Sequence, residues 1–506
     1  VTGVQTCALP ICVVRKMIRV FRRSFSCITF RSKLFMPTKK DESLGKLDMP
    51  KFARLLLKGG YVHQTEPGMF SFLPLGQRVM DEIIHVVDDH FDKADAQKMQ
   101  MPILQSTDRW EQTGRKEKMG KELFTLKDRK DQEYCLSPTN EEVITSLVKD
   151  LAIPACYPMI LYQTSPKFRD EKRILSGVLR SKEFLMTDAY SFDKTPEEAS
   201  QTFDKMNQCF LDIFHDLEIP IHSLEADNGV MGGSKSREFQ CICGVGQDKV
   251  LHCPVCNYTT LFPPTSSTCS HLQSDSTVQP LPSLELGHMF LLGDRYSSPF
   301  NLVTPAGNVM MGCYGLGLSR ILGSIFQLYG YRSGVVFPDT ITTYDVVLVD
   351  AGRSEATRQC VIDLLDALGD TNALRVLFDD RPCSLGAKMK DAELMGARAA
   401  VIVGRGFEER KQIDLRLLHG SLIRSVLNDT SNEEIGEIHS ALREKVKTFD
   451  SDGLEQMGFD LRNKQAARDP HEGFTVQTDF ATLYIHLIRL LSYVKRSEER
   501  RVGKEC

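Results

Sequence analysis

The fold of this chain is decided by a stretch that begins Phe168-Arg169-Asp170-Glu171 and continues, after Arg180, with Glu183-Phe184-Leu185-Met186-Thr187-Asp188-Ala189-Tyr190-Ser191-Phe192. Apolar residues recur through 159–164 and 184–192, which predicts neighbouring strands of one antiparallel sheet. On a strand, Arg169 and Glu171 would project from the same face, because side chains alternate with period 2. The planar fork of Arg suits a phosphate or carboxylate, and Glu can accept from an amino group such as that of adenine. The alternative is a surface ion pair between the two, which is common and weak.

A second stretch reads Gly312-Cys313-Tyr314-Gly315-Leu316-Gly317-Leu318-Ser319-Arg320. It predicts a strand that runs into a helix, with glycines that let a ligand approach the backbone. A dinucleotide-binding fingerprint would need a third glycine where Arg320 stands, so that interpretation fails. An Arg at this place suits a terminal phosphate; the alternative is a tight packing turn without a ligand.

The third stretch is Ser137-Pro138-Thr139-Asn140-Glu141-Glu142. It is typical of a helix start, where a capping hydroxyl and first-turn acids favour the dipole. The functional alternative is that Thr139 and Glu141 hold a substrate amine.

After Pro338 the apolar pattern changes to an alternation of strands (345–350, 374–379, 399–404) and helices (355–368, 385–395). Such alternation predicts a separate α/β domain on a largely parallel sheet. We therefore divide the chain into 48–338 and 339–495, with 428–473 charged and unplaced and a final apolar helix at 479–491.

Together, in this order, the three stretches resemble the prolyl-tRNA synthetases over residues 68–404. Gly68–Pro102, Phe168–Phe192 and Gly312–Arg320 are similar to the three class II signatures, and Leu286-Gly-His-Met-Phe290 to a proline-specific piece. The resemblance implies an α/β fold: an α+β catalytic domain with the class II antiparallel sheet flanked by helices, followed by a C-terminal α/β anticodon-binding domain. The stretch Lys172–Gly177 departs from the family pattern and leaves the local loop geometry open.

The resemblance also implies an aminoacyl-tRNA synthetase that uses ATP and Mg²⁺, joins L-proline to tRNA(Pro) and forms a homodimer. Arg169 and Arg320 would be catalytic. ATP would contact Arg169, Glu171, Arg180, Gly315, Gly317 and Arg320; proline would contact Thr139, Glu141, Arg169, His288 and Cys313. In the C-terminal domain, Asp380, Arg381 and Lys388 are the anticodon-binding candidates.

Charge and composition limit how these partners could bind. The 63 Lys and Arg against 67 Asp and Glu leave a formal net charge of −4, so a tRNA surface must be a local basic patch. The sequence has no apolar run of transmembrane length, and we expect no membrane partner. The homodimer would use the helix 78–91 and a strand 100–104, whose apolar stripe a monomer would expose.

Residues 241–285 form a polar insertion that is too short for the editing domain of many bacterial relatives. Within it, Cys253 and Cys256 have zinc-ligand spacing, and Cys269 and His271 could complete a site. Because the Cys-x-His half is irregular, we expect free thiols rather than zinc. The other cysteines are mostly scattered singly, which indicates a reducing compartment.

The two ends look foreign. Residues 1–11 and 496–506 resemble translated sequencing adapters, and we expect neither to belong to the natural protein. Residues 12–47 are basic, with no acid before Asp41, and from Met17 they have the profile of a mitochondrial transit peptide. The resulting expectation is a location in the mitochondrial matrix; the alternative is a basic arm that touches tRNA.

Two rival functions are a non-catalytic paralogue that binds nucleic acid, and a synthetase for threonine or serine. Arg169, Glu171 and Arg320 argue against the first. His288 and Cys313 argue against the second.

Overall fold

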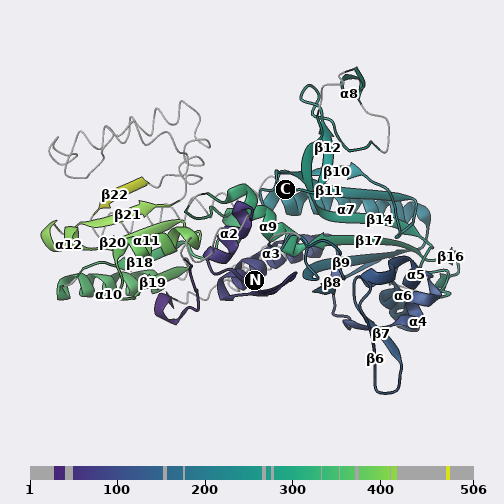
Figure 1. Ribbon diagram of the computed structural model, residues 1–506, viewed down its shortest axis with the longest axis horizontal. Helices are drawn as coiled ribbons and strands as arrows, with labels where there is room; N and C mark the ends of the chain where they lie inside the picture. Colours follow the sequence, from purple (N-terminus) through teal and green to yellow (C-terminus); the bar gives the residue numbers. More distant parts are fainter. Residues whose placement is uncertain are drawn as a thin grey trace, which may run out of the picture. The chain divides into compact units, whose positions relative to one another are not determined.

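A computed structural model describes residues 28–39, 49–151, 156–174, 177–264, 269–274, 279–331, 333–352, 354–370, 375–410, 412–418 and 474–478 (Figure 1). The chain divides into two compact units, 36–341 and the pair of segments 1–35 and 342–506. The boundary near residue 340 agrees with the sequence prediction. The predicted helix 479–491, the segment 428–473 and both predicted adapter ends lie outside the described residues.

The unit 36–341 is built on a nine-stranded sheet, of which seven strands follow the order β10-β11-β14-β17-β9-β8-β4. The two strands predicted from the decisive stretch are neighbours in it: β8 (Met159–Phe168) pairs antiparallel with β9 (Glu183–Asp193). Next to β9 comes β17 (Met310–Gly317), and next to it β14 (Leu281–Gly293). The remaining strands of this order are β4 (Ala96–Lys98), β10 (His222–Glu225) and β11 (Lys235–Ile242).

Three amphipathic helices flank this sheet: α3 (Pro74–Lys93), α7 (Pro196–Asp216) and α9 (Leu318–Tyr329). α7 begins where the Thr195 hydroxyl accepts from the Glu198 N–H, a capping bond that satisfies an orphan donor. It packs on β9, β14 and β17, and α3 packs on both α7 and α9. The class II architecture predicted from the sequence is confirmed.

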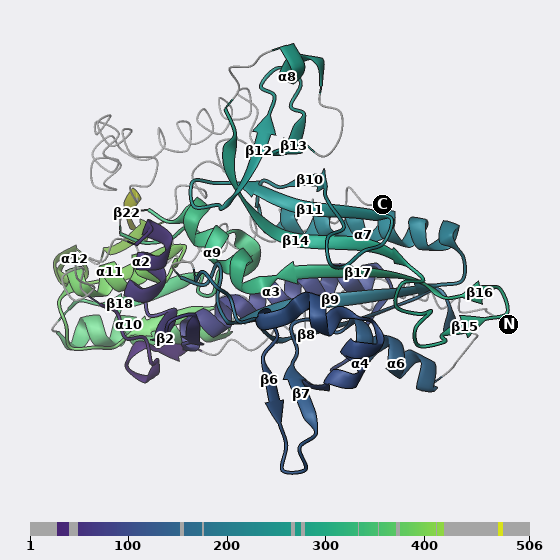
Figure 2. The ribbon, with the colours of Figure 1, turned by 45° about the vertical axis from the view of Figure 1, so that its right-hand side comes forward.

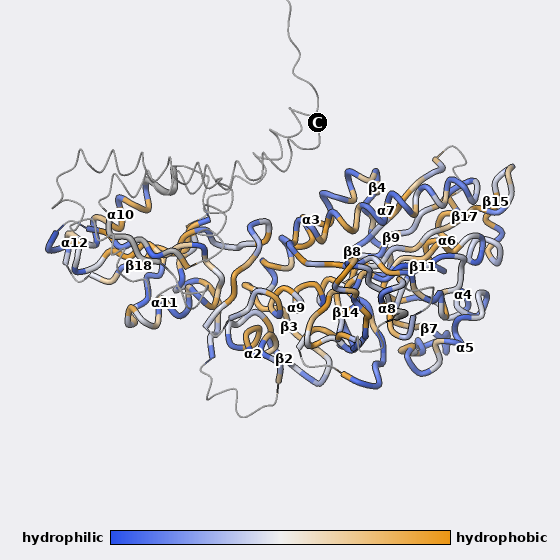
Figure 3. The backbone as a smooth tube through the Cα atoms, turned by 90° about the horizontal axis from the view of Figure 1, so that it is seen from above, coloured by the Kyte–Doolittle hydropathy of each residue, from blue (hydrophilic) through white to orange (hydrophobic). Residues whose placement is uncertain are grey.

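One expectation about α3 is wrong. Its apolar stripe, coloured as hydrophobic stretches in Figure 3, is covered within a single chain, and Val79, Ile83, Val87 and Phe91 are fully buried. The strand predicted at 100–104 is also absent, because that segment is irregular between β4 and β5 (Leu104–Ser106). An exposed stripe on this helix therefore no longer argues for a dimer.

Smaller elements surround the sheet. The first group contains α2 (Lys51–Lys58), β2 (Val62–Glu66), β3 (Met69–Phe72), β15 (Val303–Thr304) and β16 (Gly307–Asn308). The second contains α4 (Thr107–Gln112), α5 (Arg115–Met119), β6 (Thr125–Lys127), β7 (Glu133–Leu136) and α6 (Glu141–Leu151). α6 is the helix predicted after Ser137.

The insertion 241–285 is more ordered than the sequence predicted. β12 (Asp248–His252) and β13 (Thr259–Leu261) form a hairpin, and the short helix α8 (Ser270–Ser274) follows. β12 also pairs with the first residues of β14, so the hairpin grows out of the main sheet as an arm (Figure 2). Polar composition hid the hairpin, because few of its side chains are buried.

The other unit has a six-stranded sheet in the order β1-β19-β18-β20-β21-β22. β18 (Val346–Asp350), β19 (Val376–Asp379) and β20 (Ala399–Val403) are parallel, and α10 (Glu355–Asp370) and α11 (Leu385–Leu394) alternate with them as predicted. The parallel part is extended by two antiparallel strands, β21 (Ile413–Leu417) and β22 (Phe474–Thr478), with α12 (Arg405–Arg410) before them.

The first strand of this sheet comes from the basic N-terminal segment. β1 (Thr29–Phe30) pairs in parallel with β19, and the next residue, Arg31, is buried against Asp391 at 2.9 Å. Ser32 donates from its backbone N–H to Asp380 at 2.8 Å. The prediction that 12–47 is a single transit segment is therefore wrong in part, because residues 29–33 belong to a folded unit. Hydropathy did not reveal this, since a two-residue edge strand has no period.

Among the helices of the described ranges, none is both long and apolar enough to cross a membrane.

Candidate active site

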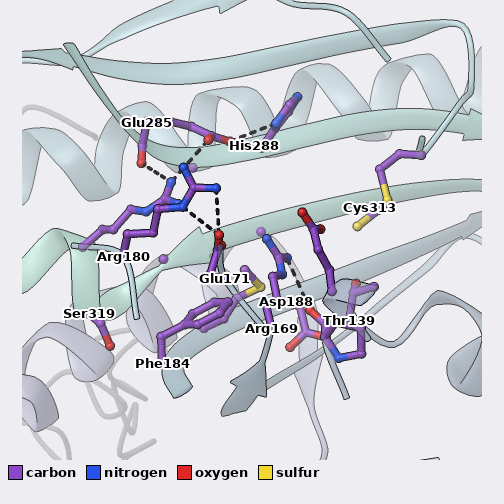
Figure 4. A pocket seen from close by; sticks show the side chains of 18 of the residues that line it. Thr139, Arg169, Glu171, Arg180, Phe184, Asp188, Glu285, His288, Cys313 and Ser319 are labelled. Carbon is purple, nitrogen blue, oxygen red and sulfur yellow. Dashed lines mark hydrogen bonds and ion pairs between the residues drawn. The ribbon is translucent and has the colours of Figure 1, made fainter. Parts of the chain in front are cut away.

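A cavity of about 310 Å³ opens over the central strands of the larger unit (Figure 4). All ten residues that the sequence assigned to ATP or proline line it. These are Thr139, Glu141, Arg169, Glu171, Arg180, His288, Cys313, Gly315, Gly317 and Arg320. Segments far apart in the sequence are thus brought to one place by β8, β9, β14, β17 and the starts of α6 and α9.

Arg169 comes directly after the last residue of β8, so the prediction that it lies on the strand is wrong by one position. Its Nη2 donates to the Pro138 carbonyl at 3.3 Å, and its guanidinium lies 5.3 Å from the centroid of the Phe184 ring. Its Nε is shielded from solvent and has no hydrogen-bond partner. Burial and the charge of Arg320 lower the pKa of Arg169. A shielded donor beside a second cation is suited to an anionic ligand.

Glu171 pairs with Arg180 and not with Arg169. Arg180 Nη2 lies 2.7 Å from Glu171 Oε2, and its Nε donates to the same oxygen at 2.8 Å. The surface ion pair considered from the sequence, Arg169 with Glu171, is therefore not formed. Both residues of this partly exposed pair line the cavity.

The opposite wall holds Arg320, Glu285 and His288. Arg320 donates to the Leu179 carbonyl at 2.9 Å and pairs with Glu285 Oε2 at 3.2 Å. His288 contacts Glu285 Oε1 through Nδ1 at 3.0 Å and Ser236 through Nε2 at 2.7 Å. Burial alone would raise the pKa of Glu285, but the His288 hydrogen bond and the charges of Arg320 and Arg169 lower it to about 2. This carboxylate therefore stays ionised and fixes both partners.

The floor is an acidic pocket built on the start of α6. Glu141 is fully buried and accepts from Thr139 Oγ1 at 2.7 Å, from Cys313 Sγ at 3.0 Å and from Arg115 Nη1 at 3.0 Å. Arg115 also pairs with Glu142 at 3.0 Å. Burial would raise the pKa of Glu141, but Arg115, Cys313 and Thr139 hold it below its ordinary value. Burial and the neighbouring Glu141 raise the pKa of Glu142. Glu141 is therefore the carboxylate that keeps its charge at the cavity, where it suits a cationic group.

Cys313 forms the wall beside this floor. Burial raises the pKa of its thiol well above the ordinary value, so the group is neutral at physiological pH. A neutral thiol beside the Phe290 ring, which stacks on His288 at 4.0 Å, gives an apolar surface next to the acidic floor.

The glycines of β17 leave room on the cavity side. A Cβ built on Gly315 would come no closer than 3.7 Å to the rest of the chain, and the same holds for Gly317. At Gly312, by contrast, a Cβ would lie 2.2 Å from the Tyr314 hydroxyl oxygen. Gly312 is thus needed for packing, whereas internal packing does not require a glycine at 315 or 317.

Sequence reasoning missed several residues of the cavity. Arg115 lies on a short helix outside every recognised motif, and its role depends on burial against Glu141. Glu285 is predicted as the end of an irregular segment, but it lies on β14, where a register shift separates it from Gly287. Asp188 and Phe184, both within the quoted β9 stretch, were given no role.

The remaining predicted residues lie elsewhere. Cys253, Cys256, Cys269 and His271 come together on the arm. In the other unit, Lys388 is buried and donates to the carbonyls of Asp350 and Asp379. Arg381 pairs with Asp379 and Asp391, and Asp380 accepts from Ser32. These three side chains hold the domain together, and their contact with an anticodon stays a prediction.

Comparison with known proteins identifies this arrangement. Residues 124–329 match the family described as tRNA synthetase class II core domain (G, H, P, S and T), and residues 345–444 match the anticodon binding domain. A probable mitochondrial proline–tRNA ligase of Homo sapiens is 35% identical over 374 residues, which cover 70% of this chain and 78% of the relative. The chain belongs to the prolyl-tRNA synthetase family.

Bacterial members of the family are similarly close. The proline–tRNA ligase of Sulfurimonas denitrificans is 33% identical over 75% of this chain and 92% of its own length. A crystal structure of prolyl-tRNA synthetase from Cryptosporidium parvum has a TM-score of 0.62 at 15% identity, covering 89% of this chain and 78% of that one. It confirms the fold. Membership makes this chain an aminoacyl-tRNA synthetase, and hence a ligase.

Proposed function

We propose that this chain activates L-proline with ATP to form prolyl-adenylate and then transfers the prolyl group to the 3′ end of tRNA(Pro). The observation that carries the proposal is the polarity of one cavity. The buried carboxylate of Glu141 lies on its floor, and two guanidinium groups, Arg169 and Arg320, lie on its walls. A zwitterionic amino acid and a polyphosphate together match this distribution of charge.

The amino acid would bind with its secondary ammonium toward Glu141 and Thr139. Its ring would lie against Cys313, Phe290 and His288, the apolar part of the wall. This orientation directs its carboxylate toward Arg169, whose shielded Nε has no hydrogen-bond partner among the residues that the structure describes. A buried donor without a partner costs about 1–3 kcal/mol, which a bound carboxylate or phosphate oxygen would recover.

The first reaction needs no general base, because the nucleophile is already a carboxylate. A proline carboxylate oxygen attacks the α-phosphorus of ATP, the bond to the bridging oxygen breaks, and pyrophosphate leaves. Arg169 would stabilise charge on the α-phosphate and Arg320 would bind the γ-phosphate, while Glu171 and Arg180 would contact adenine. Rate acceleration then comes from positioning and from fixed positive charge.

Carboxylates that could hold Mg²⁺ lie beside this cavity, of which Glu285 and His288 are lining residues. Glu238, Glu285 and His288 each present a ligand atom, and these atoms all lie within 4.8 Å of one another. Mg²⁺ prefers carboxylate oxygens together with substrate phosphates, so Glu238 and Glu285 are the residues that would hold it. When bound, the ion would supply charge neutralisation on the phosphates.

In the second reaction a ribose hydroxyl of the terminal tRNA nucleotide attacks the acyl carbon, and AMP leaves. The anticodon binding match at 345–444 supports tRNA as the partner. We further propose that the protein works in the mitochondrial matrix, a location supported by mitochondrial relatives such as the one from Schizosaccharomyces pombe, which is 34% identical over 381 residues. A transit peptide would then have to end before Thr29, because β1 belongs to the folded unit.

Proline-dependent ATP–pyrophosphate exchange tests the proposal against its rivals. We expect exchange with proline and none with threonine or serine, followed by aminoacylation of tRNA(Pro). Exchange driven by threonine or serine would establish a different amino acid specificity. A folded protein that binds tRNA without any exchange would establish the non-catalytic paralogue and overturn the proposal. For localisation, import into isolated mitochondria is the corresponding measurement, and failure of import would contradict the matrix assignment.

A further inference from the structure

The arm that projects from the sheet carries a four-residue cluster outside the catalytic cavity (Figure 2). Cys253 follows β12 directly, and Cys256 lies in the turn before β13. Cys269 immediately precedes α8, and His271 lies in the first turn of that helix. The ligand atoms of these four residues all lie within 4.8 Å of one another. In the tetrahedral geometry of zinc, sulfur atoms about 2.3 Å from the metal lie about 3.8 Å apart, so a small contraction of this cluster completes a site.

The turn that holds the first pair has the backbone of a metal-binding knuckle. The backbone of Cys253 makes two hydrogen bonds within this turn. The Asn257 N–H donates to the Cys253 carbonyl at 2.9 Å, and Asn257 has a φ of 57°, a left-handed conformation that reverses the chain. The Cys253 N–H in turn donates to the Tyr258 carbonyl at 2.8 Å. Both cysteines of the pair are thereby held with their sulfurs on the same side.

The chemistry of the four groups selects the metal. Three cysteine sulfurs and one imidazole form a soft donor set that suits Zn²⁺ and excludes Mg²⁺ and Ca²⁺, which prefer oxygen. None of the three cysteines forms a disulfide in the structure. The sequence favoured free thiols because the spacing of Cys269 and His271 is irregular. The start of α8 removes that objection, since it places both residues opposite the turn.

Few buried apolar side chains stabilise the tip of the arm. Val250 is buried at the base of the hairpin, whereas Val255 and Phe262 expose 71% and 45% of their surface. A small element with so small a core usually depends on a metal or a disulfide for its order. Binding of the metal would tie the β12–β13 turn to the start of α8, because each segment supplies two of the four ligands.

We propose that Cys253, Cys256, Cys269 and His271 bind one structural Zn²⁺ that fixes the tip of this arm. The site is separate from the catalytic cavity, none of whose lining residues belongs to it. Loss of the metal would therefore loosen the arm without removing any group that contacts proline or ATP.

The test is metal content of the full-length protein purified without added chelator. We expect about one zinc per chain by plasma mass spectrometry. The variant Cys256→Ser, which changes an exposed ligand, should lose zinc while retaining proline-dependent exchange. The matched control Cys383→Ser changes an exposed cysteine of the other unit and should keep zinc at the wild-type level.

A second measurement keeps the proposal testable if Cys256→Ser folds poorly. In the wild-type protein, the reactivity of cysteines toward a thiol reagent should rise when a strong chelator is added, and peptide mapping should assign the rise to 253, 256 and 269. Zinc content that is unchanged in Cys256→Ser and in His271→Ala would overturn the proposal. So would a wild-type protein that holds no zinc after loading and dialysis, or a disulfide between Cys253 and Cys256.

Discussion

The Cys313 thiol donates a 3.0 Å hydrogen bond to the buried carboxylate of Glu141, joining strand β17 to the first turn of α6. The neutral wall of the cavity is thereby attached to its charged floor. A ligand that contacts both must have a cationic group close to an apolar surface. The secondary ammonium and ring of proline meet this requirement.

Replacement of Glu141 tests the charged floor. In Glu141→Gln the amide keeps the shape but loses the charge, and hydrogen bonds to charged groups contribute about 1.5–3 kcal/mol. We expect KM for proline to rise about 10- to 150-fold with little change in KM for ATP. Glu117→Gln, at an exposed position on α5, is the control. Equal rises in both KM values, or a large fall in Tm, would show that Glu141 stabilises the fold rather than binding proline.

Arg169→Ala tests the phosphate contact. The guanidinium would act mainly in the transition state, and loss of such a contact costs about 3–4 kcal/mol. We expect proline-dependent exchange to fall about 100- to 1,000-fold while the far-ultraviolet circular dichroism is unchanged. Arg129→Ala, in the exposed β6–β7 hairpin, should be as active as the wild type. Near-normal exchange by Arg169→Ala would rule out the assigned role.

Gly315→Ala tests whether a ligand comes close to β17. Its methyl group would meet only ordinary contacts within the chain, at 3.7 Å and beyond, so Tm should be preserved. If ATP lies against this strand, KM for ATP should rise by about tenfold or more, since about 1.4 kcal/mol of lost contact is a factor of ten. Gly244→Ala has open space around its Cβ and serves as the control. An unchanged KM for ATP would show that the nucleotide lies elsewhere in the cavity.

Dimerisation remains a prediction that rests on the resemblance to the prolyl-tRNA synthetases, because the apolar stripe of α3 is covered within one chain. Sedimentation velocity at micromolar concentration should give about twice the chain mass of 57.1 kDa. A protein that sediments as a monomer and is fully active would refute it.

The short insertion predicts that the protein does not edit alanine. A pocket shaped for proline cannot strongly exclude a smaller side chain, because a missing methylene forfeits only about 1–3 kcal/mol. The described parts of 241–285 form a strand end, the arm and the start of β14, and Glu285 alone among them lines the catalytic cavity. Preformed alanyl-tRNA(Pro) should therefore be hydrolysed at the spontaneous rate when the protein is added. Faster hydrolysis that is lost on substitution within 241–284 would make the arm an active site.

The elements that hold the cavity were predictable because their patterns are strong. β9 and β17 have runs of apolar residues next to functional side chains, and α9 follows a glycine junction. Arg115 could not be found in the same way. Its partners Glu141 and Glu142 look like helix-start acids in the sequence, and only burial shows that they need a cation. The same limit applies to Glu285, whose ion-pair partner Arg320 comes from helix α9, 35 positions further along the chain.

The N-terminal strand and the arm were missed for another physical reason. Both are stabilised by a few specific contacts rather than by a periodic apolar face. Hydropathy does not detect such contacts, for example the contact of Arg31 with Asp391 or that of Cys253 with its own turn. For this reason the sequence patterns predicted 12–47 as one leader segment and 241–285 as an irregular segment.

The place of β1 in the sheet also sets an order of events during synthesis. Ser32 and Asp380, which are joined by a hydrogen bond, are separated by 348 positions in the chain. At about 5–20 residues per second, the ribosome would need roughly 20–70 s to make the partner strand after the first one has emerged. Throughout that interval the edge strand has no sheet to join, so β1 can pair only after the rest of its unit has been made. The first residues of the smaller domain are therefore among the last to reach their final position, and a chaperone that binds extended apolar segments would find them available for that time.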